Sequence, residues 1–218
     1  MSIALITANF GGIDIIKTEP KQEGVEYKRF YFNETNTPFP LPNLPPRLQA
    51  KYFKTQSHKI PALKDYYIHC WVDAGFQIKS PHFLEHATSQ LDQYYHIGIE
   101  NHPLRNCIYD EVRYIHENIN DPYLHSRYAS QPLKEELEYY WSYGMPKNYG
   151  LYACGMFIRD ITKTENFFNE WWDLCLRWSY FDQTAFAFLA WKEKPALVKL
   201  AMGNYFDNRF YEHTGHLR

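Results

Sequence analysis

The sequence lacks the features that direct a protein to nucleic acid or into a membrane. Lys and Arg total 23 against 25 Asp and Glu, a net charge of −2, so no basic field is available to hold a phosphodiester backbone. No apolar run reaches membrane-spanning length, and the apolar start MSIALITANFGG has no basic region of the kind that signal peptides carry. We therefore expect a cytoplasmic protein with no nucleic-acid partner and no membrane span.

Common metal and cofactor motifs are also missing. The four cysteines lie far apart in apolar segments and form no C-x-x-C pair, so we expect small core residues with reduced thiols, namely Cys70, Cys107, Cys154 and Cys175. No G-x-G-x-x-G fingerprint supports a nicotinamide dinucleotide site, and no H-E-x-x-H supports a zinc hydrolase. A mononucleotide site stays open.

Aromatic residues, by contrast, are abundant. The chain has 19 Tyr, 15 Phe and 6 Trp, together 18% of its residues. Most of them suit core packing, as in the helically spaced segment around Trp171 and Trp172, but Tyr and Trp also form platforms for sugar rings. With 45% hydrophobic and 22% charged residues, the 218-residue chain can bury a sizeable core, which favours a single folded domain over residues 1–218.

Strand-like and helix-like segments alternate along the chain, which predicts a three-layer α/β domain. We expect strands at residues 3–10, 26–33, 66–73, 94–100, 150–160 and 195–200. We expect helices at residues 45–58, 81–93, 162–178 and 182–193, an interrupted helical region at 107–144, and a polar-aromatic tail at 205–218. No internal repeat or low-complexity tract is present.

Two strand ends carry the residues best placed for ligand binding. In an open α/β sheet, ligands bind beyond the carboxyl ends of the strands. The first expected strand ends with Thr7, Ala8, Asn9 and Phe10, and the third ends with Asp73, which Ala74 and Gly75 follow. The small residues Ala74 and Gly75 leave space for a ligand beside the strand end. The alternative for Asp73 is an aspartate that caps the next turn.

Several segments, taken in order, resemble a family of GT-A-type glycosyltransferases and glycosyltransferase-like proteins. They are ITANFGG, KYFKTQSHKIPALKDYYIHCWVDAGFQI, HPLRNCIYDE, GLYACGMFIR and FDQTAFAF. The family includes bacterial capsule-type enzymes, a capsid-glycosylating domain of large algal viruses and a plant domain of unknown function. The resemblance spans nearly the whole chain. It implies a GT-A-like (Rossmann-like) mixed central sheet flanked by helices, and a host-cytoplasmic location if the chain is viral.

The resemblance also implies a reaction. A hexose or deoxyhexose would move from a nucleoside diphosphate sugar, with a UDP-sugar favoured, to a hydroxyl of a glycan or glycoprotein acceptor in capsid, capsule or surface-polysaccharide glycosylation. Such enzymes use an Asp-x-Asp pair to hold a divalent metal, Mn²⁺ or Mg²⁺, that neutralises the leaving diphosphate. Asp73 matches the first carboxylate, whereas Gly75 stands in place of the second.

Basic residues are candidates for the donor and the acceptor. Lys51, Lys54 and His58 share one face of an expected helix and could meet diphosphate oxygens; the alternative is a solvated face. His102 and Arg105 flank Pro103 and could grip an acceptor or a phosphate. The alternative for Arg105 is an ordinary surface ion pair.

The last candidates are a metal-binding histidine and a catalytic carboxylate. The resemblance implies a late histidine as metal ligand, either His213 or His216, and the alternative is a frayed tail. Asp182 is the catalytic candidate. It would act as general base in an inverting enzyme, and in a retaining one it would face the anomeric carbon or position the acceptor. The alternative is a helix N-cap.

Two other function classes stay open beside the glycosyltransferase. A catalytically silent nucleotide-sugar or carbohydrate-binding module would explain the incomplete Asp-x-Asp and the many aromatic residues. A metal-dependent hydrolase would use Asp73 and the histidines, without any recognisable ligand spacing.

Overall fold

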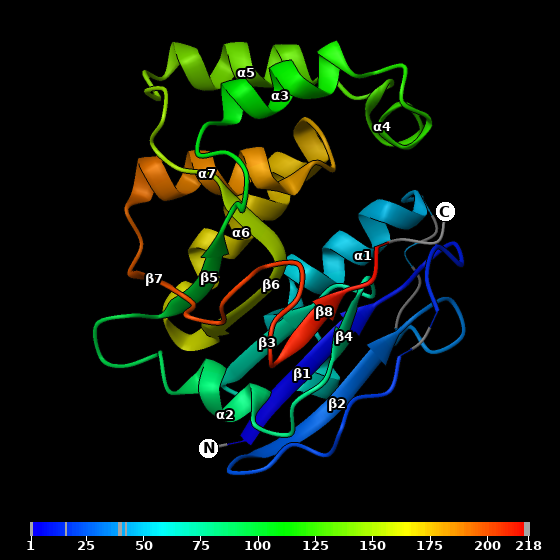
Figure 1. Cartoon of the computed structure of the whole chain (residues 1–218), viewed down its shortest axis with the longest axis vertical. Helices are drawn as coiled ribbons and strands as arrows, with labels where there is room; N and C mark the ends of the chain where they lie inside the picture. Colours follow the sequence, from blue (N-terminus) through cyan, green and yellow to red (C-terminus); the bar gives the residue numbers. More distant parts are fainter. Residues whose placement is uncertain (1, 16, 39–40, 42, 216–218) are drawn as a thin grey trace.

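A six-stranded mixed sheet forms the centre of the computed structural model, which describes residues 2–15, 17–38, 41 and 43–215 (Figure 1). The strand order is β2-β1-β3-β6-β5-β7. The strands are β1 Ser2–Ala8, β2 Glu26–Phe32, β3 Ile68–Val72, β5 Ile97–Asn101, β6 Tyr152–Asp160 and β7 Leu197–Lys199. All neighbours pair in parallel except β6, which is antiparallel to both β3 and β5. The predicted α/β class with a mixed central sheet flanked by helices is confirmed.

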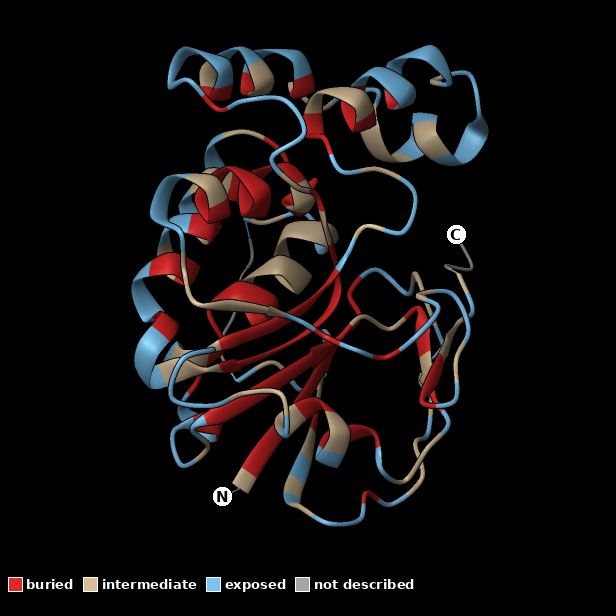
Figure 2. Cartoon of the chain, turned by 60° about the vertical axis from the view of Figure 1, so that its left-hand side comes forward, coloured by how far each residue is buried: buried red, intermediate tan, exposed pale blue. Residues whose placement is uncertain are grey.

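The two faces of the sheet bury different cores because side chains alternate along each strand. In β1, Ala4 and Ile6 pack on the face covered by α1 (Pro46–Thr55), α6 (Ile161–Arg177) and α7 (Asp182–Glu193). Ile3 and Leu5 pack on the opposite face with α2 (Phe83–Thr88). The central strands β1, β3, β5 and β6 are buried almost throughout, as Figure 2 shows in red, whereas the edge strands β2 and β7 are partly exposed.

Three helices between β5 and β6 stand at one end of the molecule, at the top of Figure 1. They are α3 Ile108–Glu117, α4 Pro122–Tyr128 and α5 Leu133–Ser142. A small core around Val112, Ile115 and Leu133 joins α3 and α5, and Phe181 completes it just before α7. No residue of α4 is buried, and its N-terminus is capped by Asp121, which accepts hydrogen bonds from two backbone N–H groups.

The sequence failed to predict a two-stranded sheet that closes the C-terminal region. Strand β4 (Phe76–Ile78) pairs antiparallel with β8 (Tyr211–His213), which lies in the segment expected to be a tail. Each strand is three residues long, too short for periodicity to reveal. The expected helix at 45–58 ends at Thr55, so His58 lies outside it in a 3-10 turn, Ser57–Lys59.

All four cysteines are buried and free, as expected of small core residues. In the part of the chain that the structure describes, no helix combines the length and the apolar character needed to cross a membrane.

Candidate functional site

A pocket opens where β1 and β3 end and α1 begins. The residues that line it are Ala8, Asn9, Phe10, Ile13, Asp14, Pro46, Arg47, Ala50, Lys51, Lys54, Trp71, Asp73, Ala74, Arg127 and Tyr180. The carboxyl ends of β1 and β3 are neighbours because these strands pair in parallel. The two strand-end segments that the sequence singled out therefore meet at one pocket, as expected for a ligand site of an α/β sheet.

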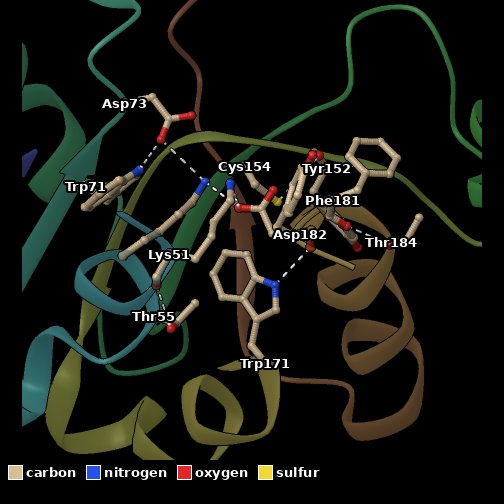
Figure 3. A network of polar contacts seen from close by, with 12 residues as sticks. Lys51, Thr55, Trp71, Asp73, Tyr152, Cys154, Trp171, Phe181, Asp182 and Thr184 are labelled. Carbon is tan, nitrogen blue, oxygen red and sulfur yellow. Dashed lines mark hydrogen bonds and ion pairs between the residues drawn. The ribbon is translucent and has the colours of Figure 1, made fainter. Parts of the chain in front are cut away.

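Two lysines of α1, Lys51 and Lys54, converge on Asp182 beside this pocket. Figure 3 labels Lys51 and Asp182. Nζ of Lys51 and Nζ of Lys54 each lie 2.6 Å from Oδ2 of Asp182. Their three-residue spacing places both ammonium groups on the same face of the helix. The Lys54 side chain is only 1% exposed. The alternative of a solvated lysine face is therefore wrong for these two residues.

The ion pairs keep Asp182 strongly acidic. Burial alone would raise the pKa of its carboxyl group, but the charges of Lys51 and Lys54 outweigh burial and lower the pKa to about 2. For Lys54, burial would lower the pKa, but Asp182 and Asp73 raise it above its ordinary value. At neutral pH Asp182 and Lys54 are therefore both charged. A carboxylate of such low basicity provides little driving force for proton abstraction.

Asp182 is not a helix cap. The N-cap of α7 is Phe181, and Asp182 is the first helical residue. Its backbone carbonyl accepts a hydrogen bond of 2.9 Å from Nε1 of Trp171 in α6, which fixes the start of α7 against the neighbouring helix. The N-cap alternative is therefore wrong, and Oδ2 of the carboxylate is bound by the two lysines.

Asp73 provides the exposed carboxylate of the site. Its Oδ1 accepts a hydrogen bond of 2.6 Å from Nε1 of Trp71 and lies 3.5 Å from Nζ of Lys54. Its side chain is 28% exposed, against 7% for Asp182. In the turn that follows β3, the backbone carbonyl of Asp73 accepts from the N–H of Phe76 at 3.0 Å. Lys54 thus bridges two carboxylates, one buried and one open to the pocket.

The other residues that were expected to bind the sugar donor fall into two groups. Ala8, Asn9, Phe10 and Ala74 line the pocket, whereas Thr7 and Gly75 do not. The hydroxyl of Thr7 donates to the carbonyl of Val72 at 2.6 Å and so ties β1 to β3. Gly75 is buried, and its carbonyl accepts from the N–H of Thr214 at 2.9 Å.

Asn9 and Phe10 line the pocket but also have structural contacts. The Asn9 amide donates to the carbonyl of Asp14 at 2.7 Å and so shapes the loop after β1. The Phe10 side chain is buried and stacks on Phe53 with ring centroids 5.5 Å apart. Both residues therefore serve the structure of the protein as well as the lining of the pocket.

His58 does not join the two lysines. Its Nε2 lies 3.1 Å from Oδ1 of Asn169, and its Nδ1 accepts from Arg159 at 3.1 Å. Burial, followed by the charge of Arg159, lowers its pKa to about 4, so the ring is neutral at physiological pH. Because α1 ends before His58, the expected continuation of the helical face does not exist, and His58 lies away from the pocket.

His102 and Arg105 lie at a second, more open pocket together with Tyr149 and Tyr152. Arg105 forms an ion pair with Glu111, and its guanidinium lies 4.2 Å from the centroid of the Tyr114 ring. Nδ1 of His102 accepts from the Arg105 backbone N–H at 3.1 Å. The ion-pair alternative thus describes the contacts of Arg105 in this structure.

The residues present do not fit an Asp-x-Asp metal site. Among the described residues, no three or more His, Cys, Asp or Glu side chains gather as metal ligands would. Oδ1 of Asp73 already accepts from Trp71 and lies near Lys54, and further cationic side chains line the same pocket. The ring of His213 packs on Phe76 at 4.7 Å, and His216 lies outside the described residues. The residues therefore do not support the expected Mn²⁺ or Mg²⁺.

Sequence reasoning missed Arg47, Arg127 and Tyr180. Arg47 could have been found, because it precedes Lys51 and Lys54 by four and seven residues and shares their helical face. Arg127 lies on α4, far away in sequence, and no local pattern links it to the pocket.

A buried glutamate supports the loop that leads into Asp182. Glu136 of α5 accepts hydrogen bonds from the hydroxyls of Tyr140 at 2.8 Å, Ser179 at 2.5 Å and Thr184 at 2.6 Å. Burial raises the pKa of its carboxyl group to about 7, although the three hydroxyls act in the opposite direction. Glu136 therefore couples α5 to both sides of Asp182.

We expect this glutamate to make stability depend on pH. Because its pKa is raised from 4.5 to about 7, the folded state binds the proton more tightly than the unfolded chain does. The resulting stabilisation is fully present below pH 4.5 and is lost as the pH rises through 7. The glutamine of Glu136→Gln does not ionise. Between pH 5 and pH 8, the free energy of unfolding in urea should therefore fall less for the variant than for the wild type. Equal losses in both proteins would contradict the prediction. Glu100, whose pKa is also raised to about 7, contributes equally to both.

Comparisons with known proteins add a structural similarity. No protein-family model matches the chain, and no curated protein matches it either. Among solved structures, mouse xyloside xylosyltransferase 1 in its apo form is similar, with a TM-score of 0.46 and 10% sequence identity over 92% of this chain and 85% of that one.

Proposed function

We propose that the protein is a glycosyltransferase. It transfers a hexose or deoxyhexose from a nucleoside diphosphate sugar, with a UDP-sugar favoured, to a hydroxyl of a glycan or glycoprotein. The observation that carries the proposal is the pocket at the ends of β1 and β3, where Lys51 and Lys54 are fixed by Asp182 beside the open carboxylate of Asp73. In this arrangement the lysines can stabilise the leaving diphosphate, and the carboxylate of Asp73 can accept hydrogen bonds from sugar hydroxyls.

The electrostatics of the pocket suit the departure of a diphosphate. Negative charge develops on the leaving group in the transition state, and preorganised donors stabilise it without reorganisation. Lys51 and Lys54 are held in place by Asp182 before any ligand arrives. In this proposal Asp182 acts through its fixed negative charge, which holds the lysines and lies opposite the positive charge that builds up on the sugar ring. Asp73, the more exposed carboxylate, meets the hydroxyl groups of the substrates.

The second pocket is proposed to take the acceptor. It combines the side chains of His102 and Arg105 with the rings of Tyr149 and Tyr152. Aromatic faces with polar neighbours suit sugar rings. Tyr152 also packs against Phe186 of α7 at 5.2 Å, on the helix that begins with Asp182. The acceptor pocket therefore adjoins the helix that presents the catalytic candidate.

Asp73→Asn should lower turnover while the protein stays folded. Asparagine keeps the shape of the side chain but loses its charge, and the site is 28% exposed, so little packing is disturbed. We expect the release of nucleotide from a donor sugar to fall at least about tenfold, as one charge-assisted hydrogen bond contributes about 1.5–3 kcal/mol. Enzyme assays beside circular dichroism test this. Wild-type turnover in a folded variant would remove Asp73 from the mechanism.

A panel of nucleoside diphosphate sugars tests the function itself. Each donor is incubated with the protein, with Mn²⁺ or with EDTA, and the released nucleotide is measured with and without simple glycan acceptors. Slow donor hydrolysis that an acceptor accelerates supports the glycosyltransferase. Tight binding without any turnover would indicate the silent binding module. Cleavage of unrelated esters but of no donor sugar would indicate the hydrolase.

A further inference from the structure

Two arginines face the pocket without a close ion pair, although Asp73 and Asp182 attract Arg127 from a greater distance. Arg47 comes from the first turn of α1 and Arg127 from the last turn of α4, two helices that approach each other only in the folded chain (Figure 1). Among the described residues, neither guanidinium forms an ion pair with a carboxylate, unlike Lys51 and Lys54. Burial, followed by the positive charge of Arg127, lowers the pKa of Arg47. Two like charges thus lie close enough to affect each other across a pocket.

Aromatic rings hold these arginines. The Arg127 guanidinium lies 5.0 Å from the ring centroid of Tyr123 and 5.5 Å from that of Tyr128, and its Nη1 donates to the Tyr123 hydroxyl. The Arg47 guanidinium lies 5.8 Å from the ring centroid of Tyr180, whose hydroxyl donates to the backbone carbonyl of Arg127. Ring contacts orient a guanidinium but do not neutralise its charge.

One hydrogen-bond donor of the two arginines has no partner among the described residues. The residue Arg127 as a whole is half-buried, but its Nε atom is buried and has no hydrogen-bond partner in the described part of the chain. A buried donor left unpaired costs about 1–3 kcal/mol, so it calls for an explanation, and a bound water or ion is one of those seen in native proteins. An anion in the pocket would satisfy it.

The charges of the pocket leave a place for an anion. Arg47, Lys51, Lys54 and Arg127 line it together with the carboxylates of Asp14 and Asp73. Asp182 lies beside the two lysines and is paired with them. Positive charge therefore remains in excess, and the two arginines carry the part that no ion pair offsets. A divalent cation would add to this excess.

We propose that Arg47 and Arg127 clamp the diphosphate of the donor and make its binding independent of a divalent metal. A metal in a glycosyltransferase neutralises the diphosphate and orients it. Guanidinium groups do both, because each presents a planar fork that matches phosphate oxygens. The absent second carboxylate at Gly75 fits this arrangement. The inference rests on the proposed function, since it assigns the donor's diphosphate to this pocket.

Isothermal titration calorimetry tests the clamp. UDP, GDP, dTDP and inorganic pyrophosphate are titrated into the protein in EDTA and in Mn²⁺, and turnover of the donor found in the sugar panel is measured under both conditions. We expect the dissociation constants and turnover to agree within about threefold between the two conditions. Arg47→Met and Arg127→Met should each weaken binding about ten- to a hundredfold, the range expected for a hydrogen bond to a charged group. Arg47→Lys and Arg127→Lys keep the charge and should lose less.

Arg113→Met is the matched control, because Arg113 is exposed on α3 and pairs with Asp110 at 2.9 Å. Its binding should equal that of wild type. Binding or turnover that appears only with Mn²⁺ would overturn the clamp and leave the glycosyltransferase standing. No binding of any nucleoside diphosphate under either condition would overturn both proposals. Metal-free binding that folded Arg47→Met and Arg127→Met variants retain in full would overturn the clamp alone.

Discussion

Asp182→Asn is expected to destabilise the protein and to slow the reaction while the affinity for UDP rises. The substitution leaves two ammonium groups without their shared partner, and Lys54 is only 1% exposed. Breaking a buried ion pair by removing one member costs about 3–5 kcal/mol of the free energy of unfolding. Nucleotide affinity should rise because the lysines no longer have a competing anion. Turnover should fall by at least about 10², the usual effect of removing one preorganised electrostatic group.

Urea unfolding, calorimetry with UDP and a donor turnover assay measure these three effects. Asp207→Asn is the control, because Asp207 is 69% exposed and pairs with Lys79 at 2.5 Å on the surface. Its effect on stability should stay below about 1 kcal/mol. If Asp182→Asn lowers UDP affinity instead, the carboxylate is not competing for the lysines, and the assignment of Lys51 and Lys54 to the diphosphate is wrong.

Lys54→Met should weaken nucleotide binding and shift the acid limb of the pH–rate profile. Methionine fills a similar space between the rings of Trp71 and Trp171, whose centroids lie 5.7 and 5.8 Å from Nζ of Lys54. Loss of the ammonium group removes one charge-assisted contact to the diphosphate, which should weaken binding about ten- to a hundredfold. Asp182 then keeps only Lys51, so its pKa rises from about 2. The pH below which activity is lost should rise with it.

Lys192→Met provides the comparison for this variant. Lys192 is an exposed lysine of α7 that pairs with Glu170 at 2.8 Å, so its loss removes a charge without opening the core. Binding of UDP and the pH–rate profile should match those of wild type. An acid limb that stays in place in a folded Lys54→Met protein would show that the ionisation of Asp182 does not limit the reaction.

Much of the fold follows from local sequence. The buried strands β3 and β6, as largely apolar runs, and helix α6, through its helical spacing of apolar residues, have local patterns that identify them without tertiary information. The short strands β4 and β8 do not, because their stability comes from pairing between segments that are distant in the chain. His58 was also misplaced by local pattern, because the helical spacing that includes Lys54 continues past Thr55, where α1 ends.

The functional site, like the fold, was predicted only in part from the sequence. Sequence alone placed Asp73 at a strand end, Lys51 and Lys54 on one helical face, and Asp182 at the start of a helix, because each statement concerns neighbours along the chain. Only the tertiary structure decided that both lysines bind Asp182 and that Arg127 from α4 joins Arg47 at the pocket. Charges separated by long stretches of chain interact through space, so their pairing and the resulting pKa of Asp182 depend on how the helices pack on the sheet.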